Sequence, residues 1–257
     1  LRRDGIDRRI AAVVTQVVVD GDDPGFSDPS KPIGPFYTEE TARRHMAEEG
    51  WAMKEDAGRG WRRVVPSPRP LEIIEEPAIQ TLLENDVIVV AVGGGGIPVY
   101  QDVGGYYRGV EAVIDKDYVA SILARDLEAD LYIVLTQVPM VAENFGRPNQ
   151  RWLRTLPAAH AREMLEQNQF PPGSMGPKIR SALEFVEATG KEVLITDEEH
   201  LKQALKREAG TFLVPEGEIE TEHPGYLGSQ DTYYVGTIKG VGRIYQQTFI
   251  DTYSRVA

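Results

Sequence analysis

The chain has 257 residues and carries 28 Lys and Arg against 40 Asp and Glu, a net charge of −12 at pH 7. This acidic balance disfavours a surface that binds nucleic acid or an anionic membrane over the whole protein. The sequence contains no cysteine, which excludes disulfide bonds and thiolate metal sites. It also contains no run approaching the roughly 20 apolar residues of a membrane-spanning helix.

The first 70 residues predict a strand, a loop, a helix and an irregular segment. Ile10–Val19 is a β-branched run, which is typical of a strand buried on both faces of a parallel sheet. A loop is expected over Asp20–Gly34, and a helix with an N-terminal threonine cap over Thr38–Glu49. Three prolines within Val64–Pro70 exclude a regular helix. We therefore expect residues 20–70 to leave the main sheet as a protruding lid.

Strands and helices alternate from residue 78 onward. Helices are expected over Ala78–Asn85, Asp117–Leu127, Ala158–Gln167, Pro177–Thr189 and Glu198–Arg207. Buried strands are expected over Val87–Val92, Leu131–Thr136, Glu192–Thr196 and Thr211–Val214. This alternation is typical of an α/β protein with a mostly parallel sheet covered by helices on both faces. The composition changes after residue 214, so we expect residues 215–257 to form a linker and a separate segment with a strand at Thr232–Ile238.

Two segments contain the residue types that bind phosphate. Four consecutive glycines, Gly93–Gly96, follow a predicted strand, and their backbone N–H groups can converge on an anion. An ordinary tight turn is the alternative, and we favour the ligand loop. In Ile114–Asp117 a lysine lies between two aspartates at a predicted helix start, where it can collect phosphate charge while an aspartate orients it. Either Asp115 or Asp117 can instead be a simple N-cap.

Further cations allow a binding or a structural interpretation. Lys178 lies in the first predicted turn of a helix, with Ser174 as a plausible N-cap. The helix dipole disfavours a lysine there unless an anionic ligand is bound, although an exposed solubilising lysine is equally compatible with the sequence. Pro- and Gly-rich segments contain further cations that fit either a phosphate ligand or a solvated surface, namely Lys31, Arg59, Arg62 and Arg63. The histidines are scattered, so we expect no metal site.

The motifs of residues 1–214 together resemble the carbamate kinase family in order and spacing. They are TQVVVDGDDPGF (Thr15–Phe26), KPIGPFYTEE (Lys31–Glu40), KEDAGRGWRRVVPSPRP (Lys54–Pro70), GGGGIPV (Gly93–Val99), GVEAVIDKD (Gly109–Asp117) and GSMGPKI (Gly173–Ile179). The resemblance implies an amino-acid-kinase fold, a three-layer α/β/α sandwich. It implies reversible phosphoryl transfer between ATP and carbamate, with Mg²⁺ accompanying the nucleotide, used mainly to make ATP from carbamoyl phosphate and ADP in arginine catabolism. A cytoplasmic homodimer without a membrane or nucleic-acid partner is expected.

The resemblance also assigns roles to individual residues of this chain. Those that would handle the transferring phosphoryl group are Lys31, Lys116, Asp117 and Lys178. Those that would line the substrate side are Gly94, Gly95 and Gly96, and those that would border the nucleotide are Met175 and Pro177. Lys31 would contact carbamoyl phosphate from the lid, and Asp117 would hold Lys116 and Lys178 in position while they neutralise the phosphoryl charge. Lysines suit this chemistry because a loose phosphoryl transition state needs positioned positive charge more than a strong base.

The sequence departs from the family at its beginning and in one later stretch. The family's GGNA-type and GNGPQVG-type loops are absent from the chain, which begins at Leu1. We therefore expect a fold that is incomplete at the N-terminus and has lost backbone donors to the substrates. Gln137, Pro139 and Ala142 stand where the family has aspartates and a tyrosine near the nucleotide. A catalytically inactive gene remnant is the alternative to an active kinase.

Residues 222–257 resemble a different family, the opening of an integrase-type transposase catalytic core. Asp231 matches the first metal-binding aspartate of that family, and Asp251 lies on the next predicted strand. A two-metal nuclease site needs carboxylates from several places, so we expect no independent strand transfer by this segment. A DNA-acting protein is a third hypothesis, which the acidic net charge disfavours.

Overall fold

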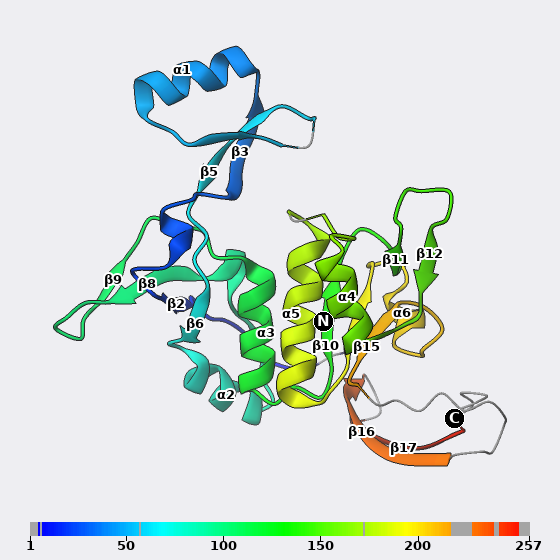
Figure 1. Ribbon diagram of the computed structural model, residues 1–257. Coiled ribbons are helices and arrows are strands. Elements are labelled where there is room, and N and C mark those ends of the chain that lie inside the picture. Colours follow the sequence, from blue (N-terminus) through cyan, green and yellow to red (C-terminus); the bar gives the residue numbers. More distant parts are fainter. Residues whose placement is uncertain are drawn as a thin grey trace. The chain divides into compact units, whose positions relative to one another are not determined.

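The computed structural model describes residues 5, 7–56, 58–171, 173–216, 228–238 and 242–251 (Figure 1). The chain divides into two compact units. The N-terminal unit is Arg9–Leu123, and the C-terminal unit is Ala124–Ala257 together with Leu1–Arg8. The sequence does not predict this division, because it falls inside a continuous helix.

Apart from the lid, the N-terminal unit is built on two small sheets. The strands of the four-stranded sheet, in spatial order, are β6 (Pro70–Ile73), β2 (Gln16–Val19), β8 (Ile97–Gln101) and β9 (Tyr107–Gly109). The two-stranded sheet pairs β1 (Ile10–Ala12) with β7 (Ile88–Val90). The helices are α2 (Glu76–Glu84) and α3 (Lys116–Asp126), the second of which continues into the other unit. Strand β2 is parallel to β8 and antiparallel to β6, so this sheet is mixed.

The β-branched run at residues 10–19 forms two strands, and its prediction as one fully buried strand is wrong. Strand β1 joins β7, whereas β2 joins the four-stranded sheet, and the chain changes sheets between them. Val17 and Val19 are buried, but Ile10 is 55% and Val14 is 75% exposed. The sequence pattern misleads because β-branched residues favour strands without specifying which sheet accepts them.

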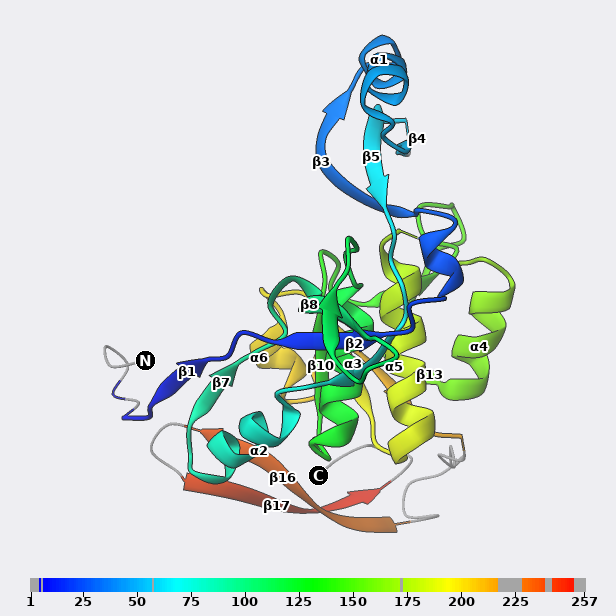
Figure 2. The same cartoon turned by 90° about the vertical axis from the view of Figure 1, so that its left-hand side faces the viewer.

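The predicted lid forms a three-stranded antiparallel sheet with one helix. Its elements are β3 (Lys31–Tyr37), α1 (Glu39–Glu49), β4 (Met53–Glu55) and β5 (Trp61–Val65), with strand order β3-β5-β4. Figures 1 and 2 show these elements projecting from the rest of the N-terminal unit. The N-cap prediction is confirmed, because the Thr38 hydroxyl accepts a hydrogen bond from the Thr41 N–H. The loop predicted to extend to Gly34 ends early, since β3 begins at Lys31 and carries its two prolines as an edge strand.

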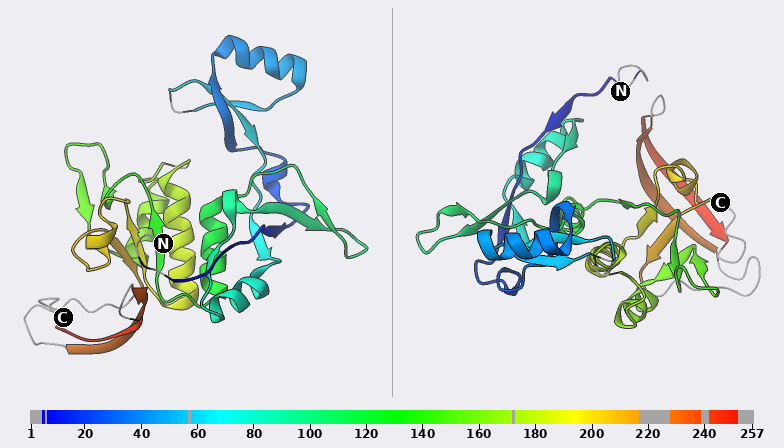
Figure 3. Two further views of the ribbon diagram at one scale, coloured as in Figure 1. Left: turned by 180° about the vertical axis from the view of Figure 1, so that it is seen from behind. Right: turned by 90° about the horizontal axis from the view of Figure 1, so that it is seen from above.

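The C-terminal unit contains a second mixed sheet between helices. Its strands, in spatial order, are β10 (Tyr132–Leu135), β14 (Val193–Thr196), β15 (Thr211–Val214) and β13 (Thr155–Pro157). The helices are α4 (Ala158–Glu166), α5 (Met175–Thr189) and α6 (Leu201–Ala204), and β11 (Val141–Glu143) pairs with β12 (Arg151–Leu153) as a separate hairpin. Figures 1 and 3 show α4 and α5 on one face of the sheet and α6 on the other.

Side chains alternate between the two faces of the C-terminal sheet. Every residue of β14 and β15 is buried, as expected for strands covered on both sides. Leu194 and Phe212 pack with Ala204 of α6. On the other face the Tyr132 ring lies 5.5 Å from the Phe185 ring of α5, measured between centroids. Coverage of both faces is therefore confirmed, although β14 and β15 run antiparallel rather than parallel.

The predicted helices have different outcomes. Helices α2, α3, α4 and α5 lie within two residues of their predicted boundaries. The helix predicted over Glu198–Arg207 is wrong, because only Leu201–Ala204 is helical and Arg207 has a φ of 61°. Among the described residues no helix is both long and apolar enough to cross a bilayer.

The last described strands form a hairpin. Strand β16 (Gly228–Ile238) pairs antiparallel with β17 (Gly242–Asp251), which confirms the strand predicted at Thr232–Ile238. Asp231 pairs in register with Thr248, and Asp251 with Gly228. The side chains of both strands lie outside the description, so the metal-binding role predicted for Asp231 stays a prediction.

Candidate functional site

A single aspartate organises the start of helix α3. The Asp115 carboxylate accepts the Asp117 backbone N–H with Oδ1 at 3.0 Å. Its other oxygen, Oδ2, accepts a hydrogen bond from the Lys31 Nζ at 2.6 Å, across 84 residues of sequence. The Asp115 side chain is 13% and the Lys31 side chain 28% exposed. The first strand of the lid is therefore joined to the N-terminal turn of α3 by a partly buried ion pair.

The electrostatics of this turn keep Asp115 ionised. Burial of the carboxyl raises its pKa. The hydrogen bonds from Lys31 and the Asp117 N–H lower this pKa, and so do the positive charges of Lys31 and Lys116. The net effect holds the pKa of Asp115 below its ordinary value. The carboxylate is thus charged at neutral pH, and the ion pair with Lys31 is present there.

The glycine loop lies directly against the same turn. Gly94, Gly95 and Gly96 have φ values of 67°, 97° and 78°, which favour glycine. A Cβ at Gly95 would collide with the Ile114 carbonyl oxygen and lie 3.5 Å from the backbone nitrogen of Lys116. Only a residue without a side chain allows this approach. The structure therefore brings together the two phosphate-type motifs of the sequence.

Half of the loop amides are used inside the loop. The N–H of Gly95 donates to the Val92 carbonyl at 3.0 Å, and the N–H of Gly96 donates to the Gly93 carbonyl at 3.1 Å. A Cβ placed on Gly93 or Gly94 would have no atom of a non-neighbouring residue within 4 Å. The N–H groups of Gly95 and Gly96 are already used, so the expected binding of an anion by backbone N–H groups is limited to Gly93 and Gly94.

Thr15 holds the entrance of the glycine loop. Its Oγ1 accepts the Val92 N–H at 3.0 Å and donates to the Val13 carbonyl at 3.0 Å. Thr15 is 4% exposed, and Val92 has a φ of 50°, an unusual conformation for a β-branched residue. The buried hydroxyl thus stabilises a strained residue directly before the glycines. This role of Thr15 could not be predicted from local sequence patterns, because Thr15 and Val92 are 77 residues apart.

The two charged residues that follow Asp115 differ in exposure. Lys116 is the first residue of α3 and is exposed, whereas Asp117 is buried. The expectation that Asp117 holds Lys116 and Lys178 stays a prediction, and the carboxylate that pairs with Lys31 is Asp115. From the sequence, Asp115 was either an N-cap or one of two aspartates that could orient Lys116, and its contact with Lys31 was not predicted. The available signal was its position in the IDKD motif, next to Lys116.

The other predicted site residues lie in the C-terminal unit. Met175, Pro177 and Lys178 form the first turn of α5, as the sequence predicted for Lys178. Ser174 occupies the N-cap position but its side chain makes no capping hydrogen bond. The N–H of Gly176 donates to the Pro171 carbonyl at 2.9 Å. Lys178 therefore belongs to a different unit from Lys31 and Lys116, and the grouping of these lysines stays a prediction.

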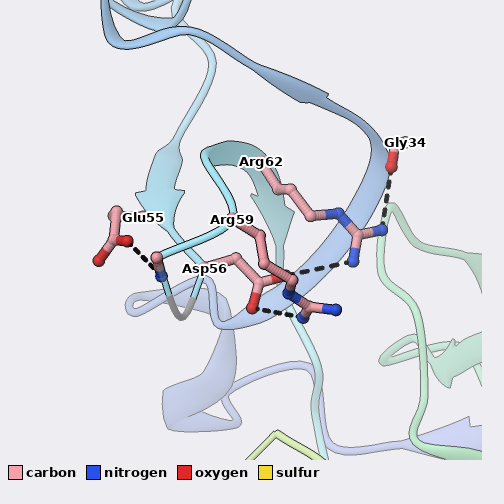
Figure 4. A network of polar contacts seen from close by, with 6 residues as sticks. Gly34, Glu55, Asp56, Arg59 and Arg62 are labelled. Carbon is pink, nitrogen blue, oxygen red and sulfur yellow. Dashed lines mark hydrogen bonds and ion pairs between the residues drawn. The ribbon is translucent and has the colours of Figure 1, made fainter.

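Two lid arginines form a polar network of their own (Figure 4). An Arg59 nitrogen lies 3.0 Å from one oxygen of Asp56, and an Arg62 nitrogen lies 3.5 Å from the other. Arg62 also donates to the Gly34 carbonyl at 3.0 Å. Both guanidinium groups lie over the Phe36 ring, about equally far from its centroid. These contacts favour the structural interpretation of the two arginines over the phosphate-binding one.

The family model described as "Amino acid kinase family" matches residues 22–197. The chain belongs to the amino acid kinase family. The match ends at residue 197 and so gives no support to the resemblance of residues 222–257 to an integrase.

Relatives within that family narrow the class further. The carbamate kinase of Thermococcus kodakarensis is 45% identical over 216 residues, which are 84% of this chain and 68% of that protein. The carbamate kinase of Clostridium perfringens is 46% identical over 215 residues, covering 83% and 68% of the two chains. These relatives assign the chain to the carbamate kinase branch, a group of phosphotransferases.

Solved structures agree with this assignment. The carbamate kinase from Giardia lamblia bound to AMP-PNP superposes with a TM-score of 0.72 at 42% identity, covering 81% of this chain and 66% of that one. A crystal structure from Aeropyrum pernix K1 gives 0.75 at 45% identity, covering 84% and 69%. The amino-acid-kinase fold expected from the sequence is confirmed. The chain spans about two thirds of the length of each of these relatives.

Proposed function

We propose that the chain transfers a phosphoryl group reversibly between carbamoyl phosphate and ADP. In the direction of ATP synthesis, the bond between phosphorus and the carbamate oxygen breaks, and a β-phosphate oxygen of ADP bonds to the phosphorus. The products are carbamate and ATP. The observation that carries the proposal is the joint position of Lys31, Lys116 and the glycine loop around the N-terminal turn of α3.

The turn suits the charge of this reaction. Lys31 and Lys116 supply cations, and the helix N-terminus adds the positive end of its dipole. Such preorganised charge stabilises a loose phosphoryl transition state, which needs little covalent help from the protein. In this proposal Lys31 contacts carbamoyl phosphate from the lid. Lys116 neutralises the phosphoryl oxygens, and Asp117 orients the lysine.

The remaining assignments rest on the resemblance of the motifs. Gly94, Gly95 and Gly96 line the substrate side. Lys178 is a further cation for the phosphoryl group, and Met175 and Pro177 border the nucleotide. Lys178 lies within the first turn of α5, where a lysine is unfavourable unless it faces an anion.

Magnesium enters the proposal as part of the nucleotide substrate. Within the described part of the chain, no group of three His, Asp or Glu side chains could hold a metal ion. Asp115 already accepts hydrogen bonds with both oxygens. This side-chain set fits Mg²⁺ that is held mainly by phosphate oxygens and water, as is usual for kinases. The ion would neutralise phosphate charge, and the lysines would supply the rest.

The biological setting is also part of the proposal. A role in arginine catabolism, in the cytoplasm and as a homodimer, rests on the family resemblance. The alternative of an inactive remnant is not favoured, because the chain is 45% identical to a carbamate kinase over 84% of its length and retains the lysines of both motifs.

The experiment is ATP formation by the purified chain from carbamoyl phosphate and ADP with Mg²⁺. We expect turnover by the unaltered chain and a decrease in kcat of about 100-fold in Lys116→Met, the usual effect of removing one transition-state donor. The matched control is Lys54→Met, because Lys54 pairs at the surface with Asp28 at 2.8 Å. It should keep the full rate. Equal rates in Lys116→Met and the unaltered chain would contradict the proposal.

A further inference from the structure

We infer that Asp115 is a positioning residue that fixes both Lys31 and the N-terminal turn carrying Lys116. The inference rests on the proposed function, since it matters for catalysis only where these lysines bind phosphate. It adds a residue to the site, because the resemblance assigned the orienting role to Asp117.

The two carboxylate oxygens of Asp115 accept hydrogen bonds from different parts of the chain. Oδ1 accepts the Asp117 N–H at 3.0 Å and so caps the first turn of α3, which fixes the backbone on either side of Lys116. Oδ2 accepts from the Lys31 Nζ at 2.6 Å. A lysine side chain has four rotatable bonds, and the partly buried ion pair selects one arrangement of them. One carboxylate thereby sets the position of two cations.

Other contacts anchor the root of the lid to the same turn. The Val113 N–H donates to the Pro66 carbonyl at 3.0 Å. The Arg69 guanidinium lies 3.8 Å from the centre of the Tyr118 ring on α3. The backbone path of the lid root is thus held independently of Asp115. Loss of the carboxylate should release the Lys31 side chain without detaching the lid.

Asp115→Asn separates the two tasks of the carboxylate. The amide oxygen can still accept the Asp117 N–H, whereas the charge that attracts Lys31 is gone. We expect kcat for ATP formation to decrease by about 10- to 100-fold, the range found when the orienting partner of a liganding residue is removed. The decisive comparison is made in a Lys31→Met background. There Asp115→Asn should cost less than about threefold, because a positioning residue acts through the residue that it positions.

A structural role predicts a different result for the same four proteins. If Asp115 only stabilised the fold, its effect on the rate would multiply with that of Lys31→Met. Equal fold-losses from Asp115→Asn with and without Lys31 would overturn the inference. All rates are normalised to the folded fraction, which circular dichroism measures.

Asp102 supplies the matched control. It caps the β8–β9 turn by accepting the N–H groups of Gly104 and Tyr106, both at 2.9 Å, and pairs with Arg108 at 2.9 Å. Asp102→Asn removes a carboxylate that, like Asp115, accepts backbone N–H groups and pairs with a cation, but that lies outside the proposed site. It should leave kcat unchanged, and a loss equal to that of Asp115→Asn would count against a specific role.

Amide hydrogen exchange tests the positioning claim without turnover. Asp115→Ala should speed exchange in the first turn of α3, whereas Asp115→Asn should leave that turn protected. Exchange in the peptide covering residues 30–37 should stay unchanged in both variants, because the backbone of the lid root is held by contacts that do not involve Asp115. Unchanged exchange in the first turn of α3 in Asp115→Ala would overturn the inference. An inactive unaltered chain with the expected exchange pattern would instead contradict the proposed function alone.

Discussion

Gly95 illustrates how a single missing side chain determines the geometry around α3. Its φ of 97° and its closeness to the Ile114 carbonyl both exclude a Cβ. Gly93, at the start of the same loop, has neither constraint, because its φ is not positive and a Cβ there would meet open space. The two glycines therefore have different requirements although they are only two positions apart in the sequence.

Alanine substitution should distinguish these two glycines. Gly95→Ala forces a left-handed alanine against a backbone carbonyl, so we expect the free energy of unfolding to decrease by about 1–3 kcal/mol or more. Gly93→Ala should change it by less than about 0.5 kcal/mol. Urea denaturation measures both values. Similar midpoints for the two variants would show that the Gly95 contact does not constrain the loop.

The contact between Asp115 and Lys31 is the part of the site that the sequence could not predict. Each lies in a motif that the sequence analysis selected, but their contact joins positions 84 residues apart. Local spacing predicts neighbours within one helix or strand and says nothing about such pairs. The positions of Lys116 and the glycine loop were predictable because each lies at the end of a recognisable element, and their roles stay predictions.

At the scale of elements, helix α1 was predictable because both of its ends carry a signal in the sequence. Helix α1 begins after the Thr38 cap and ends at Gly50, which adopts a left-handed conformation. Helix α5 likewise ends at Gly190. The helix predicted at Glu198–Arg207 has no such pair of signals, and only one turn of it forms.

The positions of the short strands in the lid were not predictable from the sequence. Strand β3 contains two prolines, and β4 is three residues long. Prolines and short length both argue against a strand when read locally. These strands form because they pair with each other in the order β3-β5-β4, which is a tertiary property.

The glycine loop is an element that depends on one buried hydroxyl. Thr15→Val keeps the shape of the side chain but leaves the buried Val92 N–H without its acceptor, so we expect a loss of about 1–3 kcal/mol in unfolding free energy. Amide exchange at residues 92–97 should increase as well. Thr15→Ser retains the oxygen and serves as the control, with protection close to that of the unaltered chain. Greater loss in Thr15→Ser than in Thr15→Val would show that the methyl group, not the hydroxyl, holds the loop.

At the scale of the whole molecule, the charge of the protein opposes that of its proposed substrates. The net charge is −12 at pH 7, while carbamoyl phosphate and ADP are anions. Binding therefore requires a local positive potential that outweighs the average field. In the proposed site, Lys31, Lys116 and the positive end of the α3 dipole would have to supply this potential against the charges of Asp115 and Asp117.

The measurement that tests the central claim most directly is phosphorus NMR of the purified chain with carbamoyl phosphate, ADP and Mg²⁺. A transferase moves the phosphoryl group to ADP without releasing it to water. We therefore expect the γ-phosphate signal of ATP to grow by the amount that the carbamoyl phosphate signal loses. If carbamoyl phosphate instead yields only inorganic phosphate, at the rate observed without protein, the account is contradicted.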